Sequence, residues 1–185
     1  IMKIALIILL VIVVLIALYF ISTYNTLVSL RNKVKDQWSQ IDVVLKNRND
    51  LIPNIVETVK GYAKHEKDTL DAVIEARSKA VSATTKDDEI KASGEVTQAL
   101  GRLFALAESY PELKANTNFL DLQNKLNEIE EKIRYARQFY NDSVLTYKNK
   151  IEMFPSNIVA GMFNFKPEAF FEATEEERKN VQVKF

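Results

Sequence analysis

An uninterrupted apolar run near the start of the chain constrains the fold more than any other feature. Residues 4–21 are eighteen consecutive apolar residues with no charge, glycine or proline. A helix rises 1.5 Å per residue, so this run spans about 27 Å, close to the roughly 30 Å hydrocarbon core of a bilayer. We therefore expect a transmembrane anchor over residues 1–22. Four residues mark the predicted span: Ile4, Leu10, Val14 and Ile21.

Two other classes of protein also begin with an apolar helix. A cleaved secretory signal has a shorter apolar core and a small-x-small cleavage site, and residues 20–25 contain no such site. A pilin-like filament subunit is a further alternative, but Ala5 stands where type IV pilins resemble one another in carrying glutamate. Ile1 is not a normal initiator, which leaves a processed N-terminus or missing upstream residues open. The pattern favours a retained anchor.

Composition argues against several classes of function. The chain has 185 residues, of which 25 are basic and 25 acidic, and its formal net charge is zero. Nucleic-acid binding needs a basic face that neutralises phosphates, so we expect no nucleic-acid partner. The absence of cysteine excludes disulfides and thiolate metal sites. Four glycines and four prolines are too few for an all-β domain with many turns.

Apolar residues at spacings of three and four continue beyond the anchor and predict four helices. We expect the first to be continuous with the anchor and to end at residues 48–50. Asp50 can cap the second helix, and Pro53 suits its first turn, where a missing N–H has no cost. Gly61 interrupts the second helix, so we expect another helix to pack closely there.

Two further helices complete the predicted architecture. The third covers residues 90–107 and ends before Pro111, because the residue that precedes a proline avoids the α region. The fourth can be capped by Asn116 or Thr117 and extends for more than four turns. Short links between helices favour antiparallel neighbours. We therefore predict an all-α fold, in which an N-terminal transmembrane helix is continuous with the first helix of a long antiparallel four-helix bundle over residues 23–153.

The predicted C-terminal segment, residues 154–185, differs in composition from the helices. Residues 154–171 hold five of the ten phenylalanines and almost no charge, whereas residues 174–179 form a charged, solvated end. The Phe-rich part either caps the open end of the bundle or is a contact surface for a partner, a second subunit or the bilayer. The candidate contact residues are Phe154, Ile158, Met162, Phe163, Phe165, Phe170 and Phe171.

Six charged residues lie beside the predicted apolar stripes. They are Arg48, Glu66, Arg77, Glu108, Glu130 and Arg137. Glu130 and Arg137 are seven residues apart and therefore lie on one face of the fourth helix. We expect a polar network of interhelical ion pairs that determines the order and register of the helices. A ligand pocket or an acid–base pair is the alternative, although nothing else in the chain completes an active site.

No residue pattern indicates catalysis or metal binding. His65 is the only histidine, and Glu66 would point about 100° away from it on a helix, so the two cannot readily share an ion. A di-iron bundle needs Glu-x-x-His from two helices, which this chain does not supply. No Ser-His-Asp arrangement with a glycine-rich elbow and no phosphate-binding glycine loop occurs. We expect neither enzymatic activity nor a cofactor or metal.

Several runs of residues resemble the signature of the LemA family of bacterial membrane proteins. They are residues 50–56 (DLIPNIV), 59–66 (VKGYAKHE), 108–116 (ESYPELKAN), 139–141 (FYN) and 154–160 (FPSNIVA), together with Trp38, Arg48, Ala76, Arg77, Ala136, Arg137, Phe170 and Phe171. The resemblance covers nearly the whole chain, and this combination of motifs is highly specific. Lys148 stands where asparagine is expected and Asn164 where glycine is usual, which affects only the detail of the C-terminal segment.

The resemblance implies one N-terminal transmembrane helix, a long antiparallel helical bundle and no established enzymatic activity. Members of the family are single-pass membrane proteins, commonly with the N-terminus outside. The charges agree, since Arg31, Lys33 and Lys35 follow the span whereas Lys3 alone precedes it. We therefore expect a protein of the bacterial cell membrane with a cytoplasmic C-terminal domain.

Two functions fit these features. The first is a membrane-anchored structural or interaction scaffold that forms a homo-oligomer. The alternative is a signalling or partner-regulating module, in which the long helix transmits a change to an unknown membrane protein. Residues 4–21 contain no small-xxx-small motif, so self-association would use the soluble helices or the Phe-rich segment.

Overall fold

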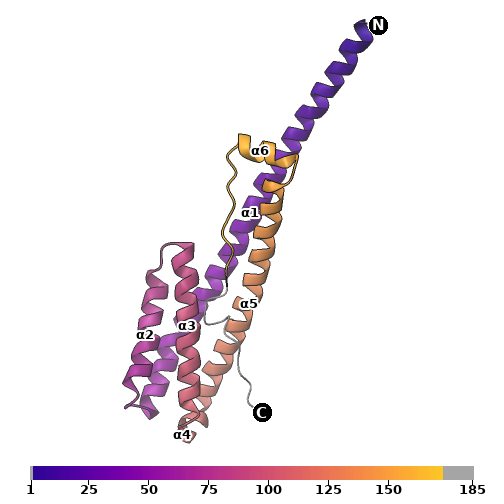
Figure 1. Cartoon of the computed structure of the whole chain (residues 1–185). Coiled ribbons are helices and arrows are strands. Elements are labelled where there is room, and N and C mark those ends of the chain that lie inside the picture. Colours follow the sequence, from indigo (N-terminus) through magenta and orange to yellow (C-terminus); the bar gives the residue numbers. More distant parts are fainter. Residues whose placement is uncertain (1, 173–185) are drawn as a thin grey trace, which may run out of the picture. The chain divides into compact units, whose positions relative to one another are not determined.

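The computed structural model describes residues 2–172 of the chain and is built from helices and their connecting loops in that range (Figure 1). The helices are α1 (Met2–Tyr62), α2 (Lys67–Ser82), α3 (Lys86–Ala107), α4 (Pro111–Lys114), α5 (Thr117–Glu152) and α6 (Ser156–Met162). The prediction of an all-α fold is confirmed for these residues. Ile1 and the predicted charged end, residues 174–179, lie outside the described part.

The predicted break of the first helix at residues 48–50 is wrong, because α1 continues through Pro53 to Tyr62 and is 61 residues long. A proline inside a helix removes the N–H that bonds the carbonyl four residues earlier. Here that carbonyl belongs to Asn49, and it accepts a hydrogen bond from Arg77 Nε at 2.8 Å. A side chain of α2 therefore replaces the missing donor. Asp50 accepts a hydrogen bond from Lys46 at 2.7 Å and does not begin a new helix.

The first helix ends at the turn formed by residues 63–66. Gly61 precedes this turn, and a Cβ added there would meet no atom within 4 Å, so the expected close packing at this glycine is wrong. His65 is exposed in the same turn, whereas we had assigned it and Glu66 to a helix. Neither Gly61 nor His65 therefore marks a close helix contact.

The later helix boundaries follow local capping chemistry. The third helix begins earlier than predicted, at Lys86, because Thr85 caps it by accepting a hydrogen bond from the backbone N–H of Asp88 at 3.2 Å. Pro111 starts the short α4, as its fixed φ allows. Asn116 is the cap of α5, since its Oδ1 accepts from the N–H of Phe119 at 2.9 Å.

The described residues divide into two compact units. The first unit comprises residues 2–39 and 138–170, and the second comprises residues 40–137 and 171–172. In the first unit α1 and α5 run in opposite directions. Trp38 of α1 contacts Tyr140 of α5, whereas Arg31, which is earlier in α1, interacts electrostatically with Tyr147, which is later in α5. Both α1 and α5 contribute residues to each unit.

The N-terminal part of α1 belongs to the first unit and carries the apolar span. It is the one helix among the described residues that is long and apolar enough to cross a membrane, and its most apolar window has no buried residue. The four residues that mark the predicted span have exposed fractions of 63%, 64%, 48% and 59% for Ile4, Leu10, Val14 and Ile21. An apolar helix with this exposure fits a membrane anchor.

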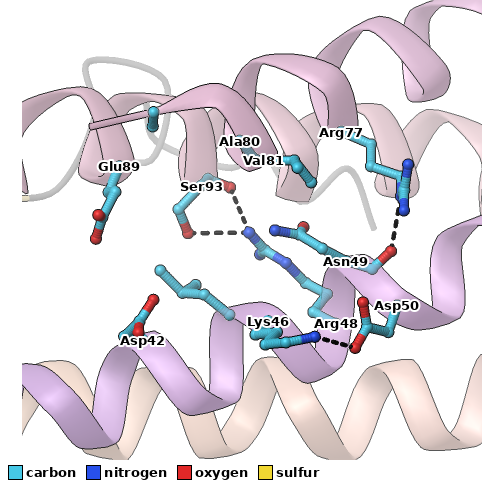
Figure 2. Close-up of a pocket in the computed structure, with 12 residues that line it drawn as sticks. Asp42, Lys46, Arg48, Asn49, Asp50, Arg77, Ala80, Val81, Glu89 and Ser93 are labelled. Atoms are coloured by element: carbon cyan, nitrogen blue, oxygen red, sulfur yellow. Dashed lines mark hydrogen bonds and ion pairs between the residues drawn. The ribbon is translucent and has the colours of Figure 1, made fainter. Parts of the chain in front are cut away.

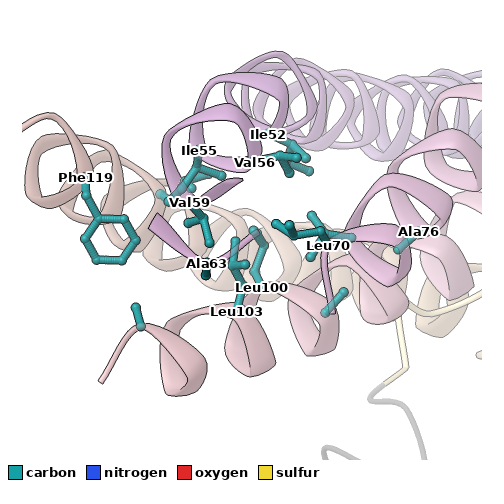
Figure 3. Packing of buried hydrophobic residues seen from close by; sticks show 14 of the residues in the cluster. Ile52, Ile55, Val56, Val59, Ala63, Leu70, Ala76, Leu100, Leu103 and Phe119 are labelled. Atoms are coloured by element: carbon teal, nitrogen blue, oxygen red, sulfur yellow. The ribbon is translucent and has the colours of Figure 1, made fainter. Parts of the chain in front are cut away.

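The core of the second unit is a cluster of buried apolar side chains from five helices. Figure 3 shows Ile55 and Val59 of α1 pointing toward Leu100 and Leu103 of α3. Other members of the cluster are Ile52, Val56, Leu70, Val73, Val96, Leu113, Phe119 and Leu126. Burial of each such side chain contributes about 1.5–3 kcal/mol relative to leaving it in water. Hydrophobic packing therefore holds α1, α2, α3 and α5 together in this unit.

The replacement of the proline's missing donor by Arg77 can be tested with a double-mutant cycle. We expect Arg77→Met to lower the free energy of unfolding by about 1–3 kcal/mol, because it leaves the Asn49 carbonyl without a partner. In a Pro53→Ala background the restored N–H bonds that carbonyl, so Arg77→Met should then have a smaller effect. Urea unfolding of the full chain in detergent, followed by circular dichroism, measures both effects. Arg102→Met, at an exposed arginine on α3, is the control. An equal loss in both backgrounds would show that Arg77 acts in another way.

Candidate functional site

Arg48 is a charged residue at a position that is otherwise apolar. Every seventh residue of α1 from Leu27 to Ile55 is fully buried, and Arg48 belongs to this series with Val34 and Ile41. A series of this spacing is typical of a helix-packing seam, in which a polar residue specifies register. A buried guanidinium stays charged only if acceptors replace the water it loses. Burial lowers the pKa of Arg48 from its ordinary value, and the nearby carboxylate of Glu130 opposes that change.

Residues of two other helices supply the acceptors. Arg48 Nη1 donates to Glu130 Oε1 of α5 and to Thr97 Oγ1 of α3, both at 2.9 Å. Arg48 Nη2 donates to the carbonyl oxygen and Oγ of Ser93 at 3.2 and 3.1 Å (Figure 2). The Thr97 hydroxyl in turn lies 3.2 Å from Glu130 Oε2. One side chain of α1 therefore links three helices of the second unit.

A cavity of about 290 Å³ lies beside Arg48 in the second unit (Figure 2). Three buried atoms of its lining residues have no hydrogen-bond partner among the described residues: Arg48 Nε, Asn49 Oδ1 and Glu89 Oε2. Leu45, Ala80, Val81 and Ala83 supply apolar lining. A cavity of this size and polarity accommodates water or a small polar molecule.

Two carboxylates face each other at one end of this cavity. Asp42 projects from α1 toward Glu89 of α3 (Figure 2). Burial raises the pKa of Glu89, the negative charge of Asp42 raises it further, and the positive charge of Lys86 opposes both. A neighbouring negative charge raises the pKa of a carboxyl group because it disfavours the charged form. Ser93 is the one hydroxyl in the lining, and it accepts a hydrogen bond from Arg48 at 3.1 Å.

Arg77 and Glu66 contact partners outside the predicted set of six charges. Arg77 donates to the Asn49 carbonyl at 2.8 Å. Glu66 Oε1 accepts a hydrogen bond from the Tyr110 hydroxyl at 2.8 Å, across the ends of α2 and α4. This hydrogen bond raises the pKa of Tyr110. Both contacts join helices of the second unit, but neither is an ion pair.

The remaining two charges of the set are at other places in the second unit. Glu108 forms an exposed ion pair with Lys114. The guanidinium of Arg137 lies over the ring of Phe171, 4.4 Å from its centre. Of the six predicted residues, the structure pairs Arg48 with Glu130, and the other four take part in separate local contacts.

The predicted Phe-rich contact surface contains both exposed and buried residues. Four are exposed, with fractions of 80%, 48%, 65% and 53% for Phe154, Ile158, Met162 and Phe163. Phe165 is buried, and its ring packs against Tyr24 at 5.7 Å between ring centres. Phe171 is also buried, and Phe170 is half-buried. The exposed residues surround α6, whereas the later phenylalanines pack against α1 and α5 in their own units.

The sequence analysis named Arg48 as one of six charges beside apolar stripes, but it did not distinguish Arg48 from the others and missed its neutral partners. Ser93 and Thr97 are four residues apart on α3, so they lie on one face of that helix, beside the buried Val96 and Leu100. Two small polar residues on an apolar face were the available signal. Asn49 gave no signal of its own, because only the tertiary structure shows that its carbonyl lacks a helical donor. Within residues 2–172, no group of three His, Cys, Asp or Glu side chains is placed to hold a metal ion.

The contribution of Arg48 to the free energy of unfolding can be compared with that of the nearby residue Lys46. We expect Arg48→Met to lower the free energy of unfolding by about 3 kcal/mol or more, because the carboxylate of Glu130 and the acceptors of Ser93 lose their cation. Lys46→Met removes an ion pair whose side chains are 71% and 57% exposed, so it should cost at most about 1 kcal/mol. Both values come from urea unfolding in detergent. Equal effects of the two substitutions would contradict a special role of Arg48.

Comparison with known proteins places this architecture in a family. The model of the LemA family matches residues 37–185. Protein LemA of Metamycoplasma hominis is 27% identical over 165 residues, which cover 89% of this chain and 75% of that protein. Magnetosome protein MamQ 2 of Paramagnetospirillum magneticum is 26% identical over 194 residues, covering 89% of this chain and 71% of that protein. Magnetosome protein MamQ of Magnetospirillum gryphiswaldense is 24% identical over 174 residues, covering 80% and 64%. With its residues 37–185 matched by the family model, the chain belongs to the LemA family.

Proposed function

We propose that the protein is a membrane-anchored, non-catalytic scaffold that associates with copies of itself. The observation that carries this proposal is the continuity of α1, which holds the apolar span and the buried Arg48 on one helix of 61 residues. A scaffold needs a membrane attachment and a well-defined surface, and this helix contributes to both. We propose further that α1, α2, α3 and α5 form an antiparallel four-helix bundle in the second unit, with Arg48 determining its register.

The relatives support a non-catalytic role. Neither of their names, protein LemA and magnetosome protein MamQ, denotes an enzyme. This observation favours a protein that acts through binding.

A groove in the first unit is the surface that we propose for self-association. Its volume is about 540 Å³, and it lies between residues of α1 and α5 that include Lys33, Gln37, Phe139 and Ser143. Phe139 is 58% exposed and is the aromatic residue among those that line this groove. An apolar side chain beside a groove between two helices suits the docking of a helix from a second copy. The apolar span lacks small-xxx-small spacing, which leaves association to the soluble part.

The mass of the gently extracted protein tests this proposal first. We expect mass photometry of the detergent complex to show a discrete multiple of the 21.2 kDa chain. Phe139→Ser should shift the distribution toward the single chain, because it removes the exposed ring at the groove. Val81→Ser is the matched control, since Val81 is 61% exposed on α2 and does not line the groove. A single chain at all concentrations would overturn the scaffold and favour the signalling module.

We also propose that the soluble part faces the cytoplasm. Arg31, Lys33 and Lys35 follow the apolar span within fifteen residues, and Lys3 is the basic residue among residues 1–3 of the given sequence. Positive residues are retained on the cytoplasmic side, so this distribution favours an external N-terminus.

The absence of native cysteine makes the orientation directly measurable. We expect Lys3→Cys to react with a membrane-impermeant maleimide in intact cells or spheroplasts. Ser78→Cys, at an exposed position on α2, should react only after the membrane is permeabilised. The reverse labelling pattern would place the soluble part outside the cytoplasm.

A further inference from the structure

The short helix α6 has two apolar faces, of which only one is covered by protein. Ser156, Val159 and Ala160 are buried at 3%, 0% and 1% exposure and form the inner face in the first unit. Ile158 and Met162 are four residues apart on the other face, and they are 48% and 65% exposed. Met153, Phe154 and Phe163 extend this exposed set, which we call the α6 surface. An exposed apolar set of this size marks an interaction site.

Contacts within the first unit place α6 at the edge of the apolar span. The ring of Phe163, which follows α6, lies 4.7 Å from that of Tyr24 of α1 between ring centres. Tyr24 is three residues beyond Ile21, the last residue of the span, and this corresponds to about 4.5 Å along the helix axis. The polar headgroup layer on each side of a bilayer is about 5–7 Å thick. Figure 1 shows α6 beside α1. If α1 spans the membrane, α6 therefore lies at headgroup depth.

The charges around α6 also match a membrane surface. Residues 153–165 contain no charged side chain; Lys150 and Glu152 precede them, and Lys166 and Glu168 follow them. Lysines on either side of an apolar segment can reach lipid phosphates while the apolar side chains enter the acyl boundary. An apolar segment with flanking lysines is typical of an interfacial anchor.

We propose that α6 is a second membrane contact, and that the α6 surface inserts into the headgroup and upper acyl region of the same bilayer that α1 crosses. The bilayer is favoured over a second copy of the chain because α1 already holds this surface beside lipid, so its insertion needs no further encounter. The inserted helix would fix the depth of the first unit at the membrane. This inference rests on the membrane anchoring included in the proposed function.

Depth-dependent fluorescence quenching of the full chain tests the inference. Trp38 is the only tryptophan, so a Trp38→Phe background allows one new tryptophan at a time. Phe154→Trp and Met162→Trp report the α6 surface in phosphatidylcholine vesicles that contain lipids brominated near the headgroup end of the acyl chains. We expect each to lose about half of its emission, because an interfacial helix places its apolar side chains about 5–10 Å into this boundary.

Two further variants separate the possible outcomes. Phe139→Trp is the control, because Phe139 is 58% exposed but lies beside Lys33 and Gln37, about 18–24 Å beyond the end of the span. It should not be quenched by bromine. Leu10→Trp should be quenched by lipids brominated near the bilayer centre, which tests the anchor independently of α6.

Three results would overturn the inference. If Leu10→Trp is quenched and Phe154→Trp resembles Phe139→Trp, α6 does not insert although the anchor stands. If Phe154→Trp is shielded from aqueous acrylamide without bromine quenching, protein covers the α6 surface instead of lipid. If Leu10→Trp is not quenched, the anchor itself fails, and the proposed function fails with it.

Discussion

The hydrogen bonding of one buried guanidinium is the interaction on which the second unit depends. Arg48 occupies a buried position in a series of apolar residues, where a leucine or isoleucine would add hydrophobic stabilisation. Its charge is tolerated because Ser93, Thr97 and Glu130 supply acceptors from α3 and α5. A shift in the register of either helix would leave a buried charge unpaired, at a cost of several kcal/mol. We infer that Arg48 contributes more to the choice of one arrangement than to net stability.

The continuity of α1 depends on a second contact of the same kind. Pro53 would normally end or kink a helix, because it removes one hydrogen bond and crowds the preceding turn. Arg77 of α2 replaces the lost hydrogen bond by donating to the Asn49 carbonyl, so a contact between two helices satisfies this acceptor. The continuity of α1 at Pro53 therefore depends on the docking of α2. The helix that begins in the apolar span extends unbroken to Tyr62.

The exposed apolar surfaces of the first unit suggest a division of roles. The α6 surface lies near the end of the span, where lipid is the nearest apolar phase, whereas the groove at Phe139 lies farther along α1 and α5. An apolar surface in contact with lipid is not available for protein association, and one far from the bilayer must be covered by protein or remain in water. On this view membrane attachment and self-association use different residues of one unit.

The sequence by itself determined the features that depend on local pattern. Eighteen apolar residues indicated the span, periodicity indicated the helices, and Asn116 was one of two predicted caps, since each signal lies within a few residues. Only the tertiary structure decided the course of α1 through Pro53 and the partners of Arg48. The donor to Asn49 is 28 residues away, and the partners of Arg48 are 45 to 82 residues away. Hydrogen bonds between residues far apart in the chain produce no periodic pattern in the sequence, because they depend on which helix faces meet after packing.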